Sequence, residues 1–181
     1  GTMSIFERDL GGPDNWGERV KIFVPGPAAG GAVASVAIDG DIVVVDSDFE
    51  DIRIGAAYIF GRNVGGPDNW GLIKRIEDPD GRQTCCDGFG SSVGVSGDTI
   101  AVGELWADRV HVFERNLGGP DNWGYVKLIT ASDDSGFPDF FSSISIEDDT
   151  LAVGAGNHTH GGVFSFGAIY IYERNAGGPD N

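Results

Sequence analysis

Basic residues are scarce in this sequence of 181 residues. It holds 12 lysines and arginines against 28 aspartates and glutamates, which gives a formal net charge of −16. Such an excess of negative charge argues against nucleic acid or an anionic membrane surface as a partner. The negative charge could serve to attract cations, to tolerate salt or to keep the protein soluble, and these three alternatives stay open.

Cysteines and long apolar segments are also scarce. The two cysteines, Cys85 and Cys86, are adjacent in the sequence, so they indicate no disulfide framework. No apolar run approaches the roughly 20 residues of a membrane span, and the sequence shows no signal peptide. We therefore expect neither a disulfide framework nor a membrane-spanning segment in this sequence.

Motifs that would indicate catalysis are missing as well. The sequence has no serine in a nucleophile elbow, no repeated pair of carboxylates and no phosphate-binding glycine loop before a helix. His111 falls in an alternating segment, Val110–Phe113, where we expect it to face outward from a strand. We therefore expect a protein that is not an enzyme.

The sequence does contain a repeat. The motif Gly-Gly-Pro-Asp-Asn-Trp-Gly begins at residues 11, 65 and 118, and a fourth copy at 177–181 reads Gly-Gly-Pro-Asp-Asn. Repeats at intervals of about 50–60 residues are typical of propeller blades or solenoid turns. We expect the recurring tryptophan to clamp its own hairpin rather than to bind a ligand.

Each copy of the motif joins two segments with strand-like alternation, which predicts a hairpin with a Gly-rich turn. The paired segments are 4–9 with 18–24, 57–63 with 71–76, and 110–116 with 124–130, and a last arm spans 168–175. Between these hairpins lie two further strand-like segments in each repeat. The first is rich in small residues, as in Phe89–Ser96, and the second is almost wholly apolar, as in Thr99–Val102.

Four antiparallel strands per repeat, with the small-residue strand innermost, are the composition of a propeller blade. The sequence thus predicts an all-β partial propeller of about three blades, in a single domain. The expected units are a leading hairpin at 4–24 and blade repeats at 25–76, 77–130 and 131–181, the last without its outer strand.

Two pairs of segments carry a family resemblance. Phe89-Gly90 with Val102-Gly103, and Phe140-Phe141 with Val153-Gly154-Ala155, resemble the FG-GAP repeat of integrin α-chain propellers, and Glu114–Gly124 looks like the hairpin of the bacterial branch. The resemblance implies a β-propeller that is secreted or at the cell surface, is used for adhesion or ligand binding, and holds calcium in loops of several blades.

The family calcium site does not carry over to this sequence. It lies in a loop between the first and second strands of a blade, and here that connection is a short turn, as at Asp39-Gly40-Asp41, that cannot supply six to eight oxygen ligands. Asp46, Asp48 and Glu50, between the second and third strands, form the candidate cation site, with a solvated acidic loop as the alternative. His158 and His160 offer a transition-metal pair or, alternatively, a polar surface loop.

Three functions stay open at this point. The first is a scaffold that completes its ring by self-association, the second is a lectin-like or adhesin-like propeller for a protein or glycan ligand, and the third is a propeller enzyme. The first is favoured because unpaired strand edges are templates for another chain. We expect a homodimer of about six blades, in which Glu18–Val24 of one chain docks onto Ala168–Asn175 of the other. Its interface residues would be Val20, Ile22, Ile169 and Ile171, and Ser4–Asp9 would be a surplus strand.

Overall fold

A computed structural model describes residues 1–25, 33, 35–47, 55–81, 88–131, 141–158 and 167–177 of the chain. The described residues form thirteen β-strands and no helix. Consequently, this part of the chain contains no helix with the length and apolar character to cross a membrane.

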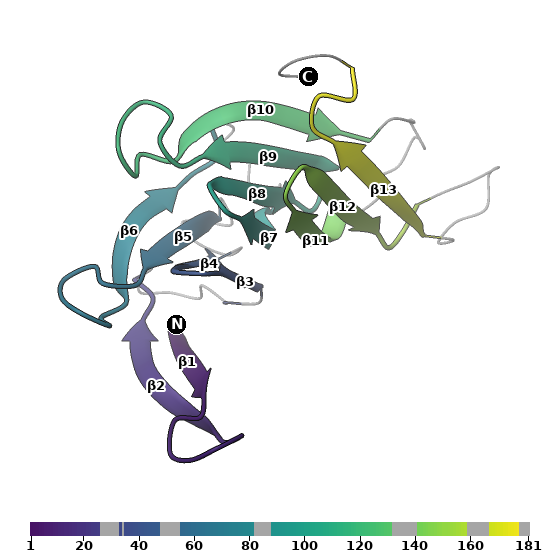
Figure 1. Ribbon diagram of the computed structural model, residues 1–181. Coiled ribbons are helices and arrows are strands. Elements are labelled where there is room, and N and C mark those ends of the chain that lie inside the picture. Colours follow the sequence, from purple (N-terminus) through teal and green to yellow (C-terminus); the bar gives the residue numbers. More distant parts are fainter. Residues whose placement is uncertain are drawn as a thin grey trace.

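The strands form four antiparallel sheets (Figure 1). We call them the leading hairpin, blade 1, blade 2 and blade 3. The leading hairpin consists of β1 (Thr2–Arg8) and β2 (Trp16–Phe23). Blade 1 consists of β3 (Val36–Asp39), β4 (Ile42–Ser47), β5 (Ala56–Gly61) and β6 (Gly71–Ile76). Blade 2 consists of β7 (Phe89–Ser96), β8 (Thr99–Glu104), β9 (Arg109–Glu114) and β10 (Gly124–Thr130). Blade 3 consists of β11 (Phe141–Glu147), β12 (Thr150–Ala155) and β13 (Ala168–Glu173).

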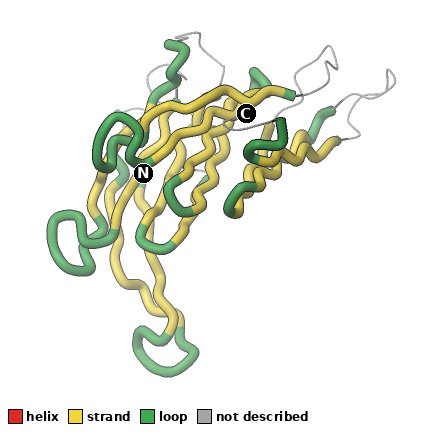
Figure 2. Tube along the Cα trace, turned by 45° about the horizontal axis from the view of Figure 1, so that its top comes forward, coloured by secondary structure: helices red, strands yellow, loops and turns green. Residues whose placement is uncertain are grey.

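Within each sheet the strands lie in sequence order and each is hydrogen-bonded to the next. The sheets follow one another side by side, with β3, β7 and β11 gathered on the inner side of the arc and β2, β6 and β10 on its outer side (Figure 1). A tube view from another direction shows the same succession of twisted sheets (Figure 2). The all-β class and the partial propeller predicted from the sequence are thereby confirmed.

The small residues of the inner strands permit close approach between blades. The inner strand β7 contacts β3 and β4 of blade 1 and β11 of blade 3. A Cβ atom added to Gly94 would lie 2.8 Å from the Ile144 Cγ2 atom of β11. Any larger residue at position 94 would therefore require Ile144 of blade 3 to shift.

Three apolar clusters lie between neighbouring sheets rather than within one sheet. The first joins the leading hairpin to blade 1 and includes Met3 and Ile5. The second joins blade 1 to blade 2, and the third joins blade 2 to blade 3. Because each apolar face is covered by the next sheet, a sheet at either end of the arc has one face that the described residues leave uncovered.

The three outer turns are built alike. The side chain of the residue before each turn accepts a hydrogen bond from the backbone N–H of the motif aspartate: Asp9 from Asp14 at 2.7 Å, Asn63 from Asp68 at 2.8 Å, and Asn116 from Asp121 at 3.2 Å. Each turn therefore places its tryptophan at the same point, at or just before the start of the outer strand.

Candidate functional site

The turn tryptophan of blade 2, Trp123, is 1% exposed and belongs to the cluster between blades 1 and 2. Ile59, Ile73 and Ile76 of blade 1 contribute to that cluster. The guanidinium of Arg115 lies 5.9 Å from the Trp123 ring centroid, a cation–π distance. A hydrogen bond to Asp121 raises the pKa of Arg115, so this cation stays charged above the indole.

One cation of blade 1 reaches across to the turn that holds Trp123. The Lys74 ammonium of β6 donates to the backbone carbonyl of Asn122, and it lies 3.3 Å from the Asn122 Oδ1 atom. We call the surroundings of Trp123 the indole site of blade 1, because its apolar wall and its lysine come from that blade.

Trp70 occupies a similar site one sheet earlier. It is 3% exposed and shares a cluster with Met3 and Ile5 of the leading hairpin, and Arg62 lies 5.3 Å from its ring centroid. Arg19 of β2 reaches the same turn through an ion pair of 2.9 Å with Asp68. Contacts with its own hairpin are present as expected, since Arg62 and Arg115 lie beside the indoles of their own hairpins. In both turns the tryptophan also belongs to a cluster shared with the preceding sheet, which was not predicted.

Trp16 of the leading hairpin has different surroundings. It is 64% exposed, and Phe6 and Phe23 of the same hairpin are 52% and 69% exposed. Met3 and Ile5 are buried against blade 1, so β1 alternates between an inward and an outward face. Since the described residues include no sheet on the outward side, the indole of Trp16 meets solvent.

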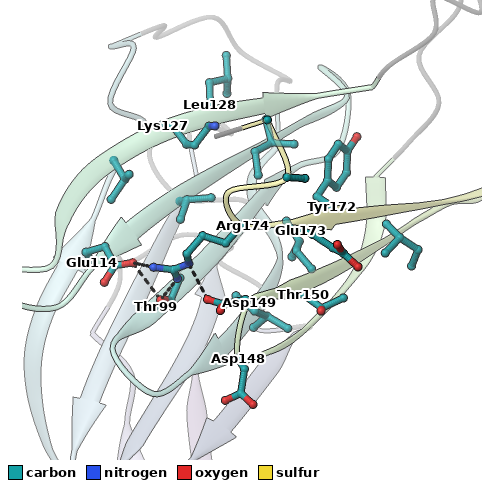
Figure 3. A pocket seen from close by; sticks show the side chains of 18 residues that line it. Thr99, Glu114, Lys127, Leu128, Asp148, Asp149, Thr150, Tyr172, Glu173 and Arg174 are labelled. Carbon is teal, nitrogen blue, oxygen red and sulfur yellow. Dashed lines mark hydrogen bonds and ion pairs between the residues drawn. The ribbon is translucent and has the colours of Figure 1, made fainter. Parts of the chain in front are cut away.

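A cavity of about 610 Å³ lies between blades 2 and 3 (Figure 3). Its apolar wall includes Val112, Val126, Leu128, Ile129, Ile146, Leu151, Ile171 and Tyr172, and its polar residues include Thr99, Glu114, Lys127, Asp149 and Arg174. Arg174 is fixed at one side of the cavity. It donates to Glu114 at 2.8 Å and to Thr99 at 2.6 Å, and it forms an ion pair of 3.1 Å with Asp149.

The cavity matches the indole site of blade 1 position by position. Lys127 pairs with Val112 across β10 and β9, as Lys74 pairs with Ile59 across β6 and β5. Val126 and Ile129 stand three and six residues after Trp123, as Ile73 and Ile76 stand after Trp70. Arg174 follows Glu173 as Arg115 follows Glu114. The cavity is thus the indole site of blade 2, and within the described ranges no indole fills it.

The four residues predicted for an interface fall into two groups. Val20 and Ile22 of β2 are partly buried against the cluster between the leading hairpin and blade 1. Ile169 and Ile171 of β13 are 76% and 59% exposed. Their role in association stays a prediction.

The predicted cation site is described only in part. Asp46 is fully buried near the end of β4, while Asp48 and Glu50 lie outside the described residues. Among the residues that are described, no group of three His, Cys, Asp or Glu could hold a metal ion. The turns between the first and second strands of the blades are two residues long, as expected.

Two histidines differ from their expected surroundings. His111 was expected to face outward, but it is fully buried and its Nε2 atom lies 3.2 Å from the Glu104 Oε2 atom, which is also buried. His158 was expected in a polar surface loop, yet it is 6% exposed and contacts the Tyr170 hydroxyl at 3.2 Å; His160 lies outside the described residues. The alternation of the strand places His111 correctly on one face, but burial of both faces of β9 could not be read from that segment alone.

Residues 70–116 and 123–172 match the family model of the FG-GAP repeat. The chain belongs to the FG-GAP repeat family. No curated protein matches this FG-GAP chain. Among solved structures, it is similar to the crystal structure of the computationally designed Ika4 protein, with 11% sequence identity and a TM-score of 0.49 over 82% of this chain and 70% of that chain.

Proposed function

We propose that this FG-GAP protein is a non-enzymatic scaffold that completes its propeller by association with a second copy of itself. The observation that carries the proposal is the outer edge of β13. In the described part of blade 3, no strand pairs with that edge, and Ile169 and Ile171 are exposed on the same strand. Unpaired strands with exposed apolar residues favour pairing with another chain.

The limits of the two FG-GAP repeats support the same proposal. Each matched repeat begins at a turn tryptophan and ends in or just after the third strand of the following blade. Residues 70–116 contain β6 to β9, and residues 123–172 run from β10 into β13. The outer strand of one blade is therefore the first strand of the next sequence repeat. For example, β6 completes blade 1 but begins the repeat that continues with the strands of blade 2. By the same division, β2 begins a repeat and would complete the blade before it.

A second copy offers β13 as the third strand of that blade. Inside one chain, Ile22 pairs with Met3 and Val20 pairs with Ile5 across the leading hairpin. Counted back from the Gly-Gly of their motifs, Ile169 and Ile171 hold the positions of Met3 and Ile5. Pairing of β2 with β13 of the second copy would thus set Ile22 opposite Ile169 and Val20 opposite Ile171. Two such junctions join two chains into a closed ring of about six blades.

Light scattering tests this proposal through the solution mass. We expect twice the chain mass of 19.0 kDa at micromolar concentration. The double variant Ile169→Glu/Ile171→Glu should shift the mass to that of one chain, because charges would face apolar residues across the new strand pair. Leu72→Glu, on the exposed side of β6, serves as the control and should leave the mass unchanged. A wild-type chain that is monomeric would contradict the proposal.

A further inference from the structure

We propose that the cavity between blades 2 and 3 binds Trp16 of a second copy of the chain. The inference rests on the proposed self-association and assigns it a specific site. On one side there is a cavity of about 610 Å³ whose wall repeats the surroundings of Trp123. On the other side there is a turn tryptophan, in the same heptapeptide motif, that is 64% exposed.

The apolar contacts of the bound indole follow from the filled site. Trp123 shares its cluster with Ile59 and Ile76, and the same positions in the cavity are Val112 and Ile129. Ile146 and Leu151 of blade 3 add a second apolar side, as Val95 and Ile100 of blade 2 do for Trp123. The cavity therefore presents an aliphatic wall on each side of the position where a flat ring would lie.

The polar contacts are also in place before binding. Arg174 is held by Glu114, Thr99 and Asp149, at the sequence position from which Arg115 and Arg62 approach their indoles at 5.9 and 5.3 Å. Lys127 corresponds to Lys74, which donates to the carbonyl of the residue before Trp123. In the complex, Arg174 would face the Trp16 ring and Lys127 would reach the carbonyl of Asn15. A cation that is already fixed near the ring position loses little freedom on binding.

Docking of Trp16 decides which of two competing strands keeps its place. In the completed blade, the strand next to β2 could be either β13 of one copy or β1 of the other, and only one of them can pair with β2 there. Since β13 contributes Ile171, Tyr172 and Arg174 to the cavity, it must stay, and β1 of the second copy must leave β2. Ile169 and Ile171 then cover the apolar positions of Met3 and Ile5, and Glu173 replaces Glu7 as the partner of Arg62.

Sedimentation velocity over a range of concentrations tests this assignment. Trp16→Ala should raise the dimer dissociation constant by at least about 30-fold, the loss expected for a central aromatic anchor. Trp106→Ala, which removes a tryptophan that is 51% exposed outside the cavity, is the matched control and should change the constant by less than about threefold.

Two further variants test the site without altering Trp16. Val126→Trp places an indole of the same chain at the cavity, from a residue that is 44% exposed and so tolerates a larger side chain, and it should weaken association to a similar degree. Deletion of residues 1–8 removes the competing strand β1. The dimer dissociation constant of this variant should be equal to or lower than that of the wild-type chain. Circular dichroism should show the wild-type strand content in each substituted variant.

The outcomes separate the two proposals. A wild-type protein that is monomeric at all concentrations overturns both. A dimer whose dissociation constant is unchanged by Trp16→Ala and by Val126→Trp overturns the assignment of the cavity and leaves the scaffold proposal standing.

Discussion

The junction between blades 1 and 2 and the junction between blades 2 and 3 are built from corresponding positions of the repeat. Their packing nevertheless differs. The first junction contains a buried indole with an arginine beside its ring and a lysine at its turn. The second has the corresponding arginine, lysine and aliphatic residues around a cavity. The difference is one aromatic side chain: in the first junction the following blade contributes a tryptophan to a site on the blade before it, and in the second the described residues contribute none.

Truncation of the buried indole should have the largest effect on stability. Trp123→Ala should lower the free energy of unfolding by about 3–5 kcal/mol, because it removes a large ring from a packed cluster. Trp16→Ala, measured by chemical denaturation at a dilution where the chain is monomeric, should change it by less than about 0.5 kcal/mol since that ring is exposed. Equal losses in the two variants would contradict the distinction between the junctions.

The aliphatic walls offer a second comparison. Ile76, which is 4% exposed in the first junction, and Ile129, at the same position in the second, differ in what covers them. Ile76→Ala should cost about 2–4 kcal/mol of unfolding free energy, as for a fully packed core residue. Ile129→Ala should cost about half as much under the same monomeric conditions, and a larger loss there would show that the cavity is closed by other residues.

The lysines give a smaller effect that sharpens the comparison. Lys74→Met keeps the apolar part of the side chain but removes the hydrogen bond to the Asn122 carbonyl, and it should cost about 0.5–1.5 kcal/mol. Lys127→Met should leave the monomer unchanged and raise the dimer dissociation constant several-fold. Thermal unfolding should therefore detect the Lys74→Met variant, and sedimentation should detect the Lys127→Met variant.

The smallest expected effect is electrostatic and belongs to the first junction. Burial is the main cause that raises the pKa of Tyr125. The negative charges of Asp80 and Asp78, just after β6, raise this pKa further. Because the folded pKa exceeds the unfolded pKa of about 10, the neutral phenol stabilises the fold below pH 10 and this contribution is lost as the pH rises through the folded pKa. Ultraviolet titration should show the Tyr125 phenol ionising above its ordinary pH, and Asp80→Asn should move its pKa toward the ordinary value.

The repeat predicted the fold because its spacing reflects a unit that is local in sequence. The hairpins, the small inner strands and the two-residue inner turns all follow from residues within one repeat. The prediction for the tryptophan covered only its own hairpin, because the remaining contacts of the ring lie in the preceding sheet and far away in sequence, as in the shared cluster of Trp123 and Ile59. The burial of His111 beside Glu104 was not predicted because the alternation of Val110–Phe113 is also that of a half-exposed strand.

The self-contained hydrogen bonding of the outer turns has a consequence for the order of folding. Bonds such as those from Asp68 to Asn63 and from Asn69 to the Val64 carbonyl join residues five apart. Their closure costs little chain entropy, and hairpins of this kind form within microseconds. Burial of each tryptophan requires the preceding sheet and so belongs to a later step. Refolding should accordingly show a rapid gain of strand signal, followed by a slower blue shift of fluorescence as the indoles of Trp70 and Trp123 leave water.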